Sequence, residues 1–254
     1  STNLMLDDYL VFWLKGTSTA NLAVVFGDNN GDQKWYSFQG STNWRTYVID
    51  FSGHPTSPDN AAKGRPLGVD NFFDWTNVDT IWFGEDIVTN FKLDYITIGD
   101  ANDFTQWHIN RYEMLVRNVD QNKFLFNTGY KWTEGRDLAW GSIYSNAGDT
   151  IEAGPGTYTQ HVVASNNNLN FKSIPFQGSA ILKPTTASTY SFEINSQGVT
   201  VDGLEIDGLN RRYAVEADNN DITIKNCIIE NTAPTGANAG GILARGHTGI
   251  LIED

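Results

Sequence analysis

Aromatic side chains are the first candidates for chemistry in this sequence, because the C–H faces of a pyranose ring stack on flat aromatic rings. Five of the eight tryptophans fall within the first hundred residues: Trp13, Trp35, Trp44, Trp75 and Trp82. Most tryptophans in a β-sandwich fill its core. The better candidates for sugar binding lie next to expected loops: Trp35, Tyr36, Phe73 and Trp75.

A short run of oxygen-bearing side chains offers a second kind of site. Asp28, Asn30 and Asp32 are spaced closely enough to surround a hard cation such as Ca²⁺. The same residue types also make an ordinary hairpin turn. The sequence leaves both interpretations open, and we favour the turn.

Charged residues near the C-terminal end form a third set of candidates. The most conspicuous are the basic pair Arg211 and Arg212, Asp207 shortly before them, and His247. Solvated loops carry the same residue types. The sequence contains no Ser-His-Asp signature, Walker loop, dinucleotide fingerprint or zinc-ligand spacing.

Composition narrows the class of protein. The formal charge of −13 argues against nucleic acid and anionic membrane surfaces as binding partners, because proteins bind both through an excess of Lys and Arg. No run of 18 apolar residues exists, so we expect no membrane span. Cys227 is the one cysteine, so a disulfide within the chain is excluded. We expect its side chain to be buried and to act as a small apolar residue.

Residues 1–100 predict an antiparallel β-sandwich. Short apolar stretches recur between clusters of Gly, Asn, Asp, Ser and Pro, as strands and turns require. These stretches are Leu10–Leu14, Leu22–Phe26, Lys34–Phe38, Trp44–Phe51, Val78–Phe83 and Phe91–Ile98. The next segment, 101–138, is interpreted as a connector between two domains.

From residue 139 onward the sequence repeats. The run Val199–Ile206 is followed 23 residues later by Ile222–Ile229, and a third copy begins 28 residues further on at Ile250. A looser copy lies at Leu169–Ile174. Such periods predict stacked coils, each resting only on its neighbours.

One position in each repeat marks a sharp corner. Gly203, Asn226 and Asp254 each follow an apolar-polar-apolar strand, and these residue types tolerate the left-handed backbone of such a corner. We therefore expect the strands that begin near Val199, Ile222 and Ile250 to lie over one another, so that 139–254 forms the first coils of a parallel β-helix.

A family resemblance agrees with this pattern. The segment Ala147–Tyr158, AGDTIEAGPGTY, resembles the entry coil of pectate-lyase-like right-handed parallel β-helix proteins, and Leu138–Ile143 resembles their N-terminal cap. The resemblance covers 139–254 with its cap and implies the fold. It does not imply one activity, because lyases, hydrolases, phage spikes and surface-layer proteins share this architecture.

Residues 1–100 resemble the jelly-roll carbohydrate-binding modules that often accompany such enzymes. The likeness is carried by Tyr9–Gly16, Trp44–Asp50, Val78–Phe83 and Leu93–Ile98. It implies a polysaccharide or cell-surface glycan as partner, and it places a structural calcium ligand at Asp94. These modules have further strands before the equivalent of Leu10, so we expect the intact protein to extend beyond both ends of this sequence.

The two resemblances imply an extracellular or cell-surface protein that binds polysaccharide and processes it as a lyase or glycoside hydrolase. In such β-helix enzymes carboxylates and basic residues act from one strand face, which makes Asp207, Arg211, Arg212 and His247 the candidates here. The alternative is a non-catalytic surface, lattice or filament protein that assembles with copies of itself.

Overall fold

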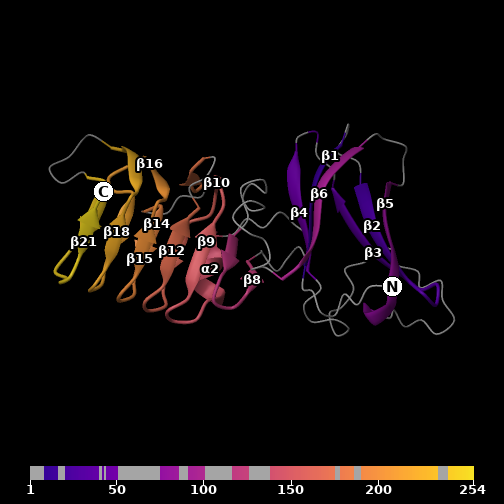
Figure 1. Ribbon diagram of the computed structural model, residues 1–254. Helices are drawn as coiled ribbons and strands as arrows, with labels where there is room; N and C mark the ends of the chain where they lie inside the picture. Colours follow the sequence, from indigo (N-terminus) through magenta and orange to yellow (C-terminus); the bar gives the residue numbers. More distant parts are fainter. Residues whose placement is uncertain are drawn as a thin grey trace. The chain divides into compact units, whose positions relative to one another are not determined.

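The computed structural model describes residues 9–16, 21–39, 42, 44–50, 75–85, 91–100, 116–125, 138–174, 178–185, 190–233 and 240–254. The chain divides into two compact units, which Figure 1 colours along the sequence. The first comprises Ser1–Asp103 with Thr128–Glu134, and the second comprises Phe104–Asn127 with Gly135–Asp254. The segment 101–138 is thus shared between the two units.

The first unit is antiparallel β, as the sequence predicts, and its described residues form two sheets of three strands each. One sheet has the order β4-β1-β6 and the other the order β3-β2-β5. Their strands are β1 (Tyr9–Gly16), β2 (Asn21–Asp28), β3 (Gln33–Gln39), β4 (Arg45–Asp50), β5 (Val78–Glu85) and β6 (Phe91–Gly99), and the short 3-10 helix η2 (Trp75–Asn77) precedes β5.

Alternating residues of these strands fill one shared core. Leu10, Phe12 and Leu14 of β1 are buried, as are Val24 and Phe26 of β2. The Phe12 ring stacks on Tyr47 of its own sheet at 5.5 Å between centroids. It also meets Phe83 of the other sheet edge-on at 5.3 Å. Such contacts between the two inner faces hold a β-sandwich together.

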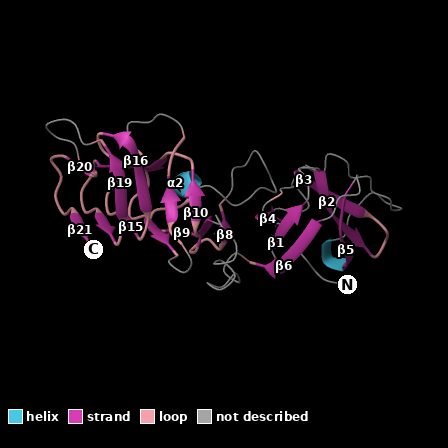
Figure 2. Cartoon of the chain, turned by 90° about the horizontal axis from the view of Figure 1, so that it is seen from above, coloured by secondary structure: helices cyan, strands magenta, loops and turns pink. Residues whose placement is uncertain are grey.

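The second unit is a parallel β-solenoid of about four turns, whose strands stack side by side in Figures 1 and 2. Sheet 1 contains β9 (Thr150–Ala153), β12 (Asn170–Ser173), β15 (Thr200–Asp202), β18 (Thr223–Lys225) and β21 (Leu251–Glu253). Sheet 2 contains β10 (Gly156–Tyr158), β13 (Ala180–Leu182), β16 (Glu205–Arg211) and β19 (Ile228–Thr232). Sheet 3 contains β11 (Val162–Ala164), β14 (Phe192–Ile194), β17 (Val215–Ala217) and β20 (Ile242–Ala244).

The register within sheet 1 confirms the predicted stacking of the repeats. Val201 pairs with Ile224, and Ile224 pairs with Ile252 of the next coil. The looser copy also belongs to the stack, because Phe171 of β12 pairs with Val201. Phe171, Val201 and Ile224 are buried and form a column of aligned core side chains, while Ile252 of the last strand is 57% exposed.

Left-handed residues line up in two stacks of corners among the described residues of the coils. The predicted corner after sheet 1 is present at two of its three residues, with φ of 75° at Gly203 and 52° at Asn226, while Asp254 has no positive φ. A second corner lies before sheet 1 and was not predicted from the sequence. It is formed by left-handed residues of every coil: Gly148, Asn168, Gly198, Asp221 and Gly249. Backbone amides at these corners donate to carbonyls of the next coil, for example Asn168 to Gln197 at 2.8 Å.

The first coil is covered by a short helix, α2 (Leu138–Tyr144), at the segment predicted to be a cap. The helix lies so close that a Cβ added at Gly141 would fall 2.8 Å from Cγ2 of Ile151. Next to it, β7 (Val116–Asn118) pairs antiparallel with β9, and β8 (Lys123–Phe124) pairs with β7. These two strands extend sheet 1 beyond its first parallel strand.

Candidate functional site

The outward face of the sheet β3-β2-β5 carries the clearest candidate site. Val24 and Phe26 of β2 point into the core, so the intervening Val25 and Gly27 face outward. Across the strands, Val25 pairs with Trp82 and Gly27 pairs with Thr80. Two outward rows of neighbouring residues therefore run across this sheet.

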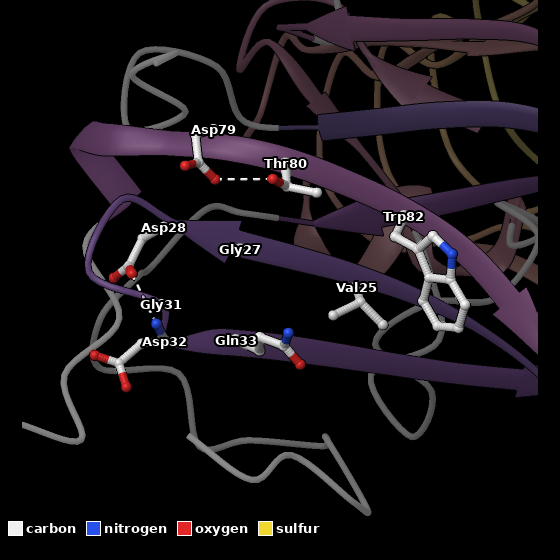
Figure 3. A pocket seen from close by; sticks show the side chains of 9 residues that line it. All are labelled: Val25, Gly27, Asp28, Gly31, Asp32, Gln33, Asp79, Thr80 and Trp82. Carbon is white, nitrogen blue, oxygen red and sulfur yellow. Dashed lines mark hydrogen bonds between the residues drawn. The ribbon is translucent and has the colours of Figure 1, made fainter. Parts of the chain in front are cut away.

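These rows line a groove with a volume of about 550 Å³. Figure 3 shows the Trp82 ring at one end and the turn that carries Asp28 and Asp32 at the other. The lining residues come from three strands and one turn: Val25, Gly27, Asp28, Gly31, Asp32, Gln33, Asp79, Thr80 and Trp82. Gly27 contributes no side chain, so the middle of the groove stays open.

Trp82 lies along its own strand, and glycine makes this possible. A Cβ added at Gly84, two residues further along the same face, would overlap the six-membered ring of Trp82. The ring therefore covers the Gly84 backbone. Trp82 is nevertheless 50% exposed, which is unusual for so large an apolar side chain. The groove thus presents a flat aromatic surface to solvent.

Polar side chains accompany the ring. Asp79 is exposed, and its Oδ1 accepts a hydrogen bond from the Thr80 hydroxyl at 2.9 Å. The Gln33 side chain reaches the groove from β3 (Figure 3). An aromatic platform with a few polar groups beside it is a typical arrangement for binding a polar ring-shaped ligand.

At the other end of the groove, the turn uses the side chain of Asp28, one of the predicted calcium residues, in its own hydrogen bonding. Asp28 Oδ1 accepts hydrogen bonds from the backbone amides of Asn30 at 3.0 Å and Asp32 at 2.9 Å, as in an Asx-type turn. Asp94 lies exposed on β6, in the other sheet. Among the residues that the structure describes, no three His, Cys, Asp or Glu side chains are grouped as metal ligands. Calcium at this turn stays a hypothesis, which the melting temperature with and without added Ca²⁺ tests.

The predicted sugar-binding residues are only partly placed. Trp35 and Tyr36 lie on β3, where Trp35 pairs with Val25 and so belongs to the same cross-strand row as Trp82. The side chains of Trp35, Tyr36 and Trp75, and all of Phe73, lie outside the described part of the chain. We did not select Trp82 from the sequence because it lies in mid-strand. The feature of the sequence that could have indicated an exposed Trp82 ring is Gly84, two residues later on the same face of the strand.

In the solenoid, Asp207 is a buried carboxylate whose ion-pair partner, Lys183, is about half exposed. Asp207 is 2% exposed, and Lys183 Nζ lies 2.7 Å from its Oδ2. Burial disfavours the charged carboxylate, but hydrogen bonds from Lys183, the Leu209 amide and Asn231 outweigh this and lower the pKa of Asp207. The hydrogen bond to Asp207 in turn raises the pKa of Lys183. This arrangement ties β13, β16 and β19 together.

The other predicted catalytic residues each make a separate contact. Arg211 donates from Nη1 to the Tyr190 carbonyl at 3.2 Å. The Arg212 guanidinium lies over the Tyr213 ring at 5.4 Å. His247 Nε2 lies 2.9 Å from Oδ1 of Asp218, in the preceding coil. These contacts do not bring the four candidates Asp207, Arg211, Arg212 and His247 to one catalytic centre.

Arg211 instead lines a second pocket, on the outside of sheet 2. Its volume is about 420 Å³. Its lining residues are Thr157, Thr159, Lys183, Pro184, Thr185, Leu209 and Arg211. Since Lys183 is already paired with Asp207, this pocket is less cationic than its two basic residues indicate.

Sheet 3 holds a carboxylate row that the sequence interpretation missed. Glu193 and Glu216 are paired in adjacent strands, and the residues on either side of each are buried. Glu193 Oε1 lies 3.1 Å from Nε2 of His161. Burial raises the pKa of Tyr190, as does its hydrogen bond to Glu216, against the opposing effect of Arg245. The signal was the 23-residue spacing of the two glutamates, which equals the repeat.

Comparisons with known proteins add no assignment: no protein-family model, curated protein or solved structure matches the chain. The parallel solenoid implied by the family resemblance is present, while membership of that family is not shown. Within the described residues, no helix combines the length and the apolar character that a membrane crossing requires.

Proposed function

We propose that this chain is a polysaccharide-binding protein of the extracellular space or cell surface, and that the Trp82 groove is its binding site. The observation that carries the proposal is the half-exposed Trp82 ring, held flat over Gly84 in a groove with polar side chains. A pyranose ring has one apolar C–H face and a rim of hydroxyls. The ring of Trp82 fits the face, and the side chains of Gln33, Asp79 and Thr80 fit the rim.

The expected energy comes mainly from covering the tryptophan. Burial of apolar surface contributes roughly 25 cal/mol per Å², so covering about 60 Å² of the ring contributes about 1.5 kcal/mol. This corresponds to about a tenfold change in affinity. The groove also needs little rearrangement, because strands rather than loops position most of its lining.

A binding assay on a panel of neutral, acidic and amino-sugar polysaccharides tests the proposal. Affinity electrophoresis of the whole chain would reveal retardation by at least one of them. Trp82→Ala should weaken that binding by about tenfold or more. Ile96→Ala is the matched control, because Ile96 is 49% exposed on β6 of the other sheet and should leave affinity unchanged.

Two outcomes would contradict the proposal. The first is unaltered glycan binding by Trp82→Ala. The second is the absence of retardation by any polysaccharide. In the second case, self-assembly of the purified chain would support the alternative function, a non-catalytic surface or filament protein.

The carboxylate row of sheet 3 supports a second candidate function, polysaccharide processing by glycoside hydrolysis. Glu193 and Glu216 come from adjacent strands, which lie about 4.8 Å apart. Two carboxyl groups about 5 Å apart are what a retaining glycosidase uses as nucleophile and acid–base. Tyr190 and His161 contact one glutamate each and so position them.

Release of reducing ends from a bound polysaccharide tests this second function. Glu193→Gln and Glu216→Gln should each lower the rate by at least about 100-fold. Glu205→Gln, on sheet 2, is the control and should leave the rate unchanged. Reducing ends accompanied by an unsaturated sugar at the new non-reducing end would indicate a lyase. Release that persists in both glutamine variants would exclude the row as a catalytic site.

A further inference from the structure

The Trp82 groove is acidic as well as aromatic. Its described lining includes three carboxylates, on Asp28, Asp32 and Asp79, and neither Lys nor Arg. The whole sequence carries a formal charge of −13, so no excess of positive charge elsewhere reverses the sign. A ligand in this groove therefore meets negative potential.

We propose, on the basis of the function proposed above, that the groove selects a polymer of protonated amino sugars, such as glucosamine, over neutral and uronate polysaccharides. Stacking on Trp82 is available to all three classes, because each has a pyranose C–H face. The carboxylates distinguish them. An ammonium group gains a charge-assisted hydrogen bond, a hydroxyl gains a weaker one, and a uronate meets repulsion from like charge.

Asp79 is the carboxylate placed for this contact. Its side chain is exposed, whereas Asp28 and Asp32 are buried at the turn. Asp28 Oδ1 is already used by the backbone amides of Asn30 and Asp32. Asp79 Oδ1 accepts one hydrogen bond, from Thr80, and a carboxylate has about four acceptor positions. Thr80 thus orients Asp79 and leaves it able to accept from an ammonium group.

The distance along β5 also fits. Asp79 and Trp82 are three residues apart, which is about 10 Å in a strand. A sugar stacked on Trp82 therefore allows another sugar further along the same oligomer to lie close to Asp79. Resemblance to pectate-lyase-like proteins implies an acidic polysaccharide as ligand. The carboxylates of this groove repel uronates, so we expect the groove to bind a different class of glycan.

Calorimetric titration with three oligosaccharides of equal length tests the selectivity: a glucosamine oligomer, its N-acetylated counterpart and a galacturonate oligomer. The pH is mildly acidic, so that the amine is protonated. The glucosamine oligomer should bind at least about threefold more tightly than its uncharged counterpart, as one exposed ion pair allows. The galacturonate oligomer should bind most weakly.

Asp79→Asn should remove the preference for glucosamine while binding of the N-acetylated oligomer stays the same. Any chain of this charge attracts a cation, so Asp94→Asn is the matched control: Asp94 is also an exposed strand residue, on the other sheet. That variant should keep the full preference. An equal loss in both variants, or tighter binding of galacturonate than of glucosamine, would overturn the proposed selectivity.

The same titrations separate the selectivity of the groove from its ability to bind a glycan at all. Binding of all three oligosaccharides with similar affinity, abolished by Trp82→Ala, would overturn the selectivity and leave the groove as a glycan site. Absence of binding by all three oligosaccharides, together with no retardation by any polysaccharide of the panel, would overturn both.

Discussion

The sandwich and the solenoid place their outward side chains in different ways. In the sandwich, the Trp82 groove combines β2 with β5, strands about fifty residues apart in the sequence. In the solenoid, each coil pairs only with the coils before and after it, and the Glu193–Glu216 row repeats at the period of the coil. The residues of a solenoid site therefore recur at the spacing of the repeat, whereas the residues of a sandwich site are brought together by long-range strand pairing.

The same difference should determine how far the destabilisation caused by a core mutation extends through each unit. This is the largest effect we expect. Phe171→Ala and Phe12→Ala each remove a fully buried ring and should each cost about 3–5 kcal/mol. Phe171 packs edge-on against Phe192 of its own coil, at 5.1 Å. Because a solenoid is a sum of neighbouring repeats, the first of these losses should be concentrated in the coils around Phe171.

Hydrogen exchange measured by mass spectrometry checks this contrast. Phe171→Ala should lower protection mainly in β9, β12 and β15, and less in β18. Phe12→Ala should lower protection in both sheets of the sandwich together, since Phe12 contacts both. Uniform loss across the solenoid in Phe171→Ala would contradict the difference between the two units.

The second prediction concerns the position that supports Trp82. Gly84→Val should displace the Trp82 ring from its place on β5, because the new side chain occupies the same space. We expect a loss of about 1–3 kcal/mol in the free energy of unfolding, as for an overpacked site. Glycan affinity should fall as far as it does in Trp82→Ala. Urea unfolding and affinity electrophoresis measure the two effects, and unchanged affinity would show that the ring position does not matter.

The third prediction compares a coil corner with a hairpin turn. Gly203 has φ of 75° and Gly31 has φ of 89°, so alanine at either position is strained by about 1–2 kcal/mol. Nothing lies within 4 Å of a Cβ at Gly31, while Ser173 Cβ lies 3.4 Å from one at Gly203. The two losses in urea unfolding should thus be similar. A much larger loss at Gly203 would show that the tightness of the corner, rather than its backbone angle, limits the residue.

The sequence predicted the solenoid better than the sandwich site, because solenoid contacts follow the repeat and sandwich contacts depend on long-range pairing. The repeats at Val199, Ile222 and Ile250 directly define which strands stack, so a local pattern predicts a contact between coils. The corner residues Gly203 and Asn226 follow from their tolerance of positive φ. Trp82 could not be selected this way, because its exposure depends on pairing with β2 and on the space over Gly84.

The catalytic candidates were selected by their charge, and charge alone did not indicate which side chains lie together. Asp207 was a candidate as a carboxylate near a basic pair, but the coil fold buries it and places Lys183 beside it. Glu193 and Glu216 were not singled out, although their spacing equals the repeat and places them next to each other. Position within the repeat, rather than charge, was the useful information.

The smallest effect we predict is a pH dependence confined to the solenoid. The folded pKa of Asp207 lies below the ordinary value of 3.8, so its stabilising contribution is complete above that value. The contribution is lost as pH falls through the lowered pKa. Unfolding of the solenoid measured from neutral pH to about pH 3 should show this decline. Asp207→Asn should flatten the decline, and an identical profile in that variant would assign it to other groups.

The most direct test of the central claim is an experimental structure of the chain with a bound oligosaccharide. We predict one sugar ring parallel to the exposed face of Trp82, with another sugar of the same oligomer within hydrogen-bonding distance of Asp79. An oligosaccharide bound elsewhere, with the Trp82 face uncovered, would contradict the assignment of this groove as the glycan site.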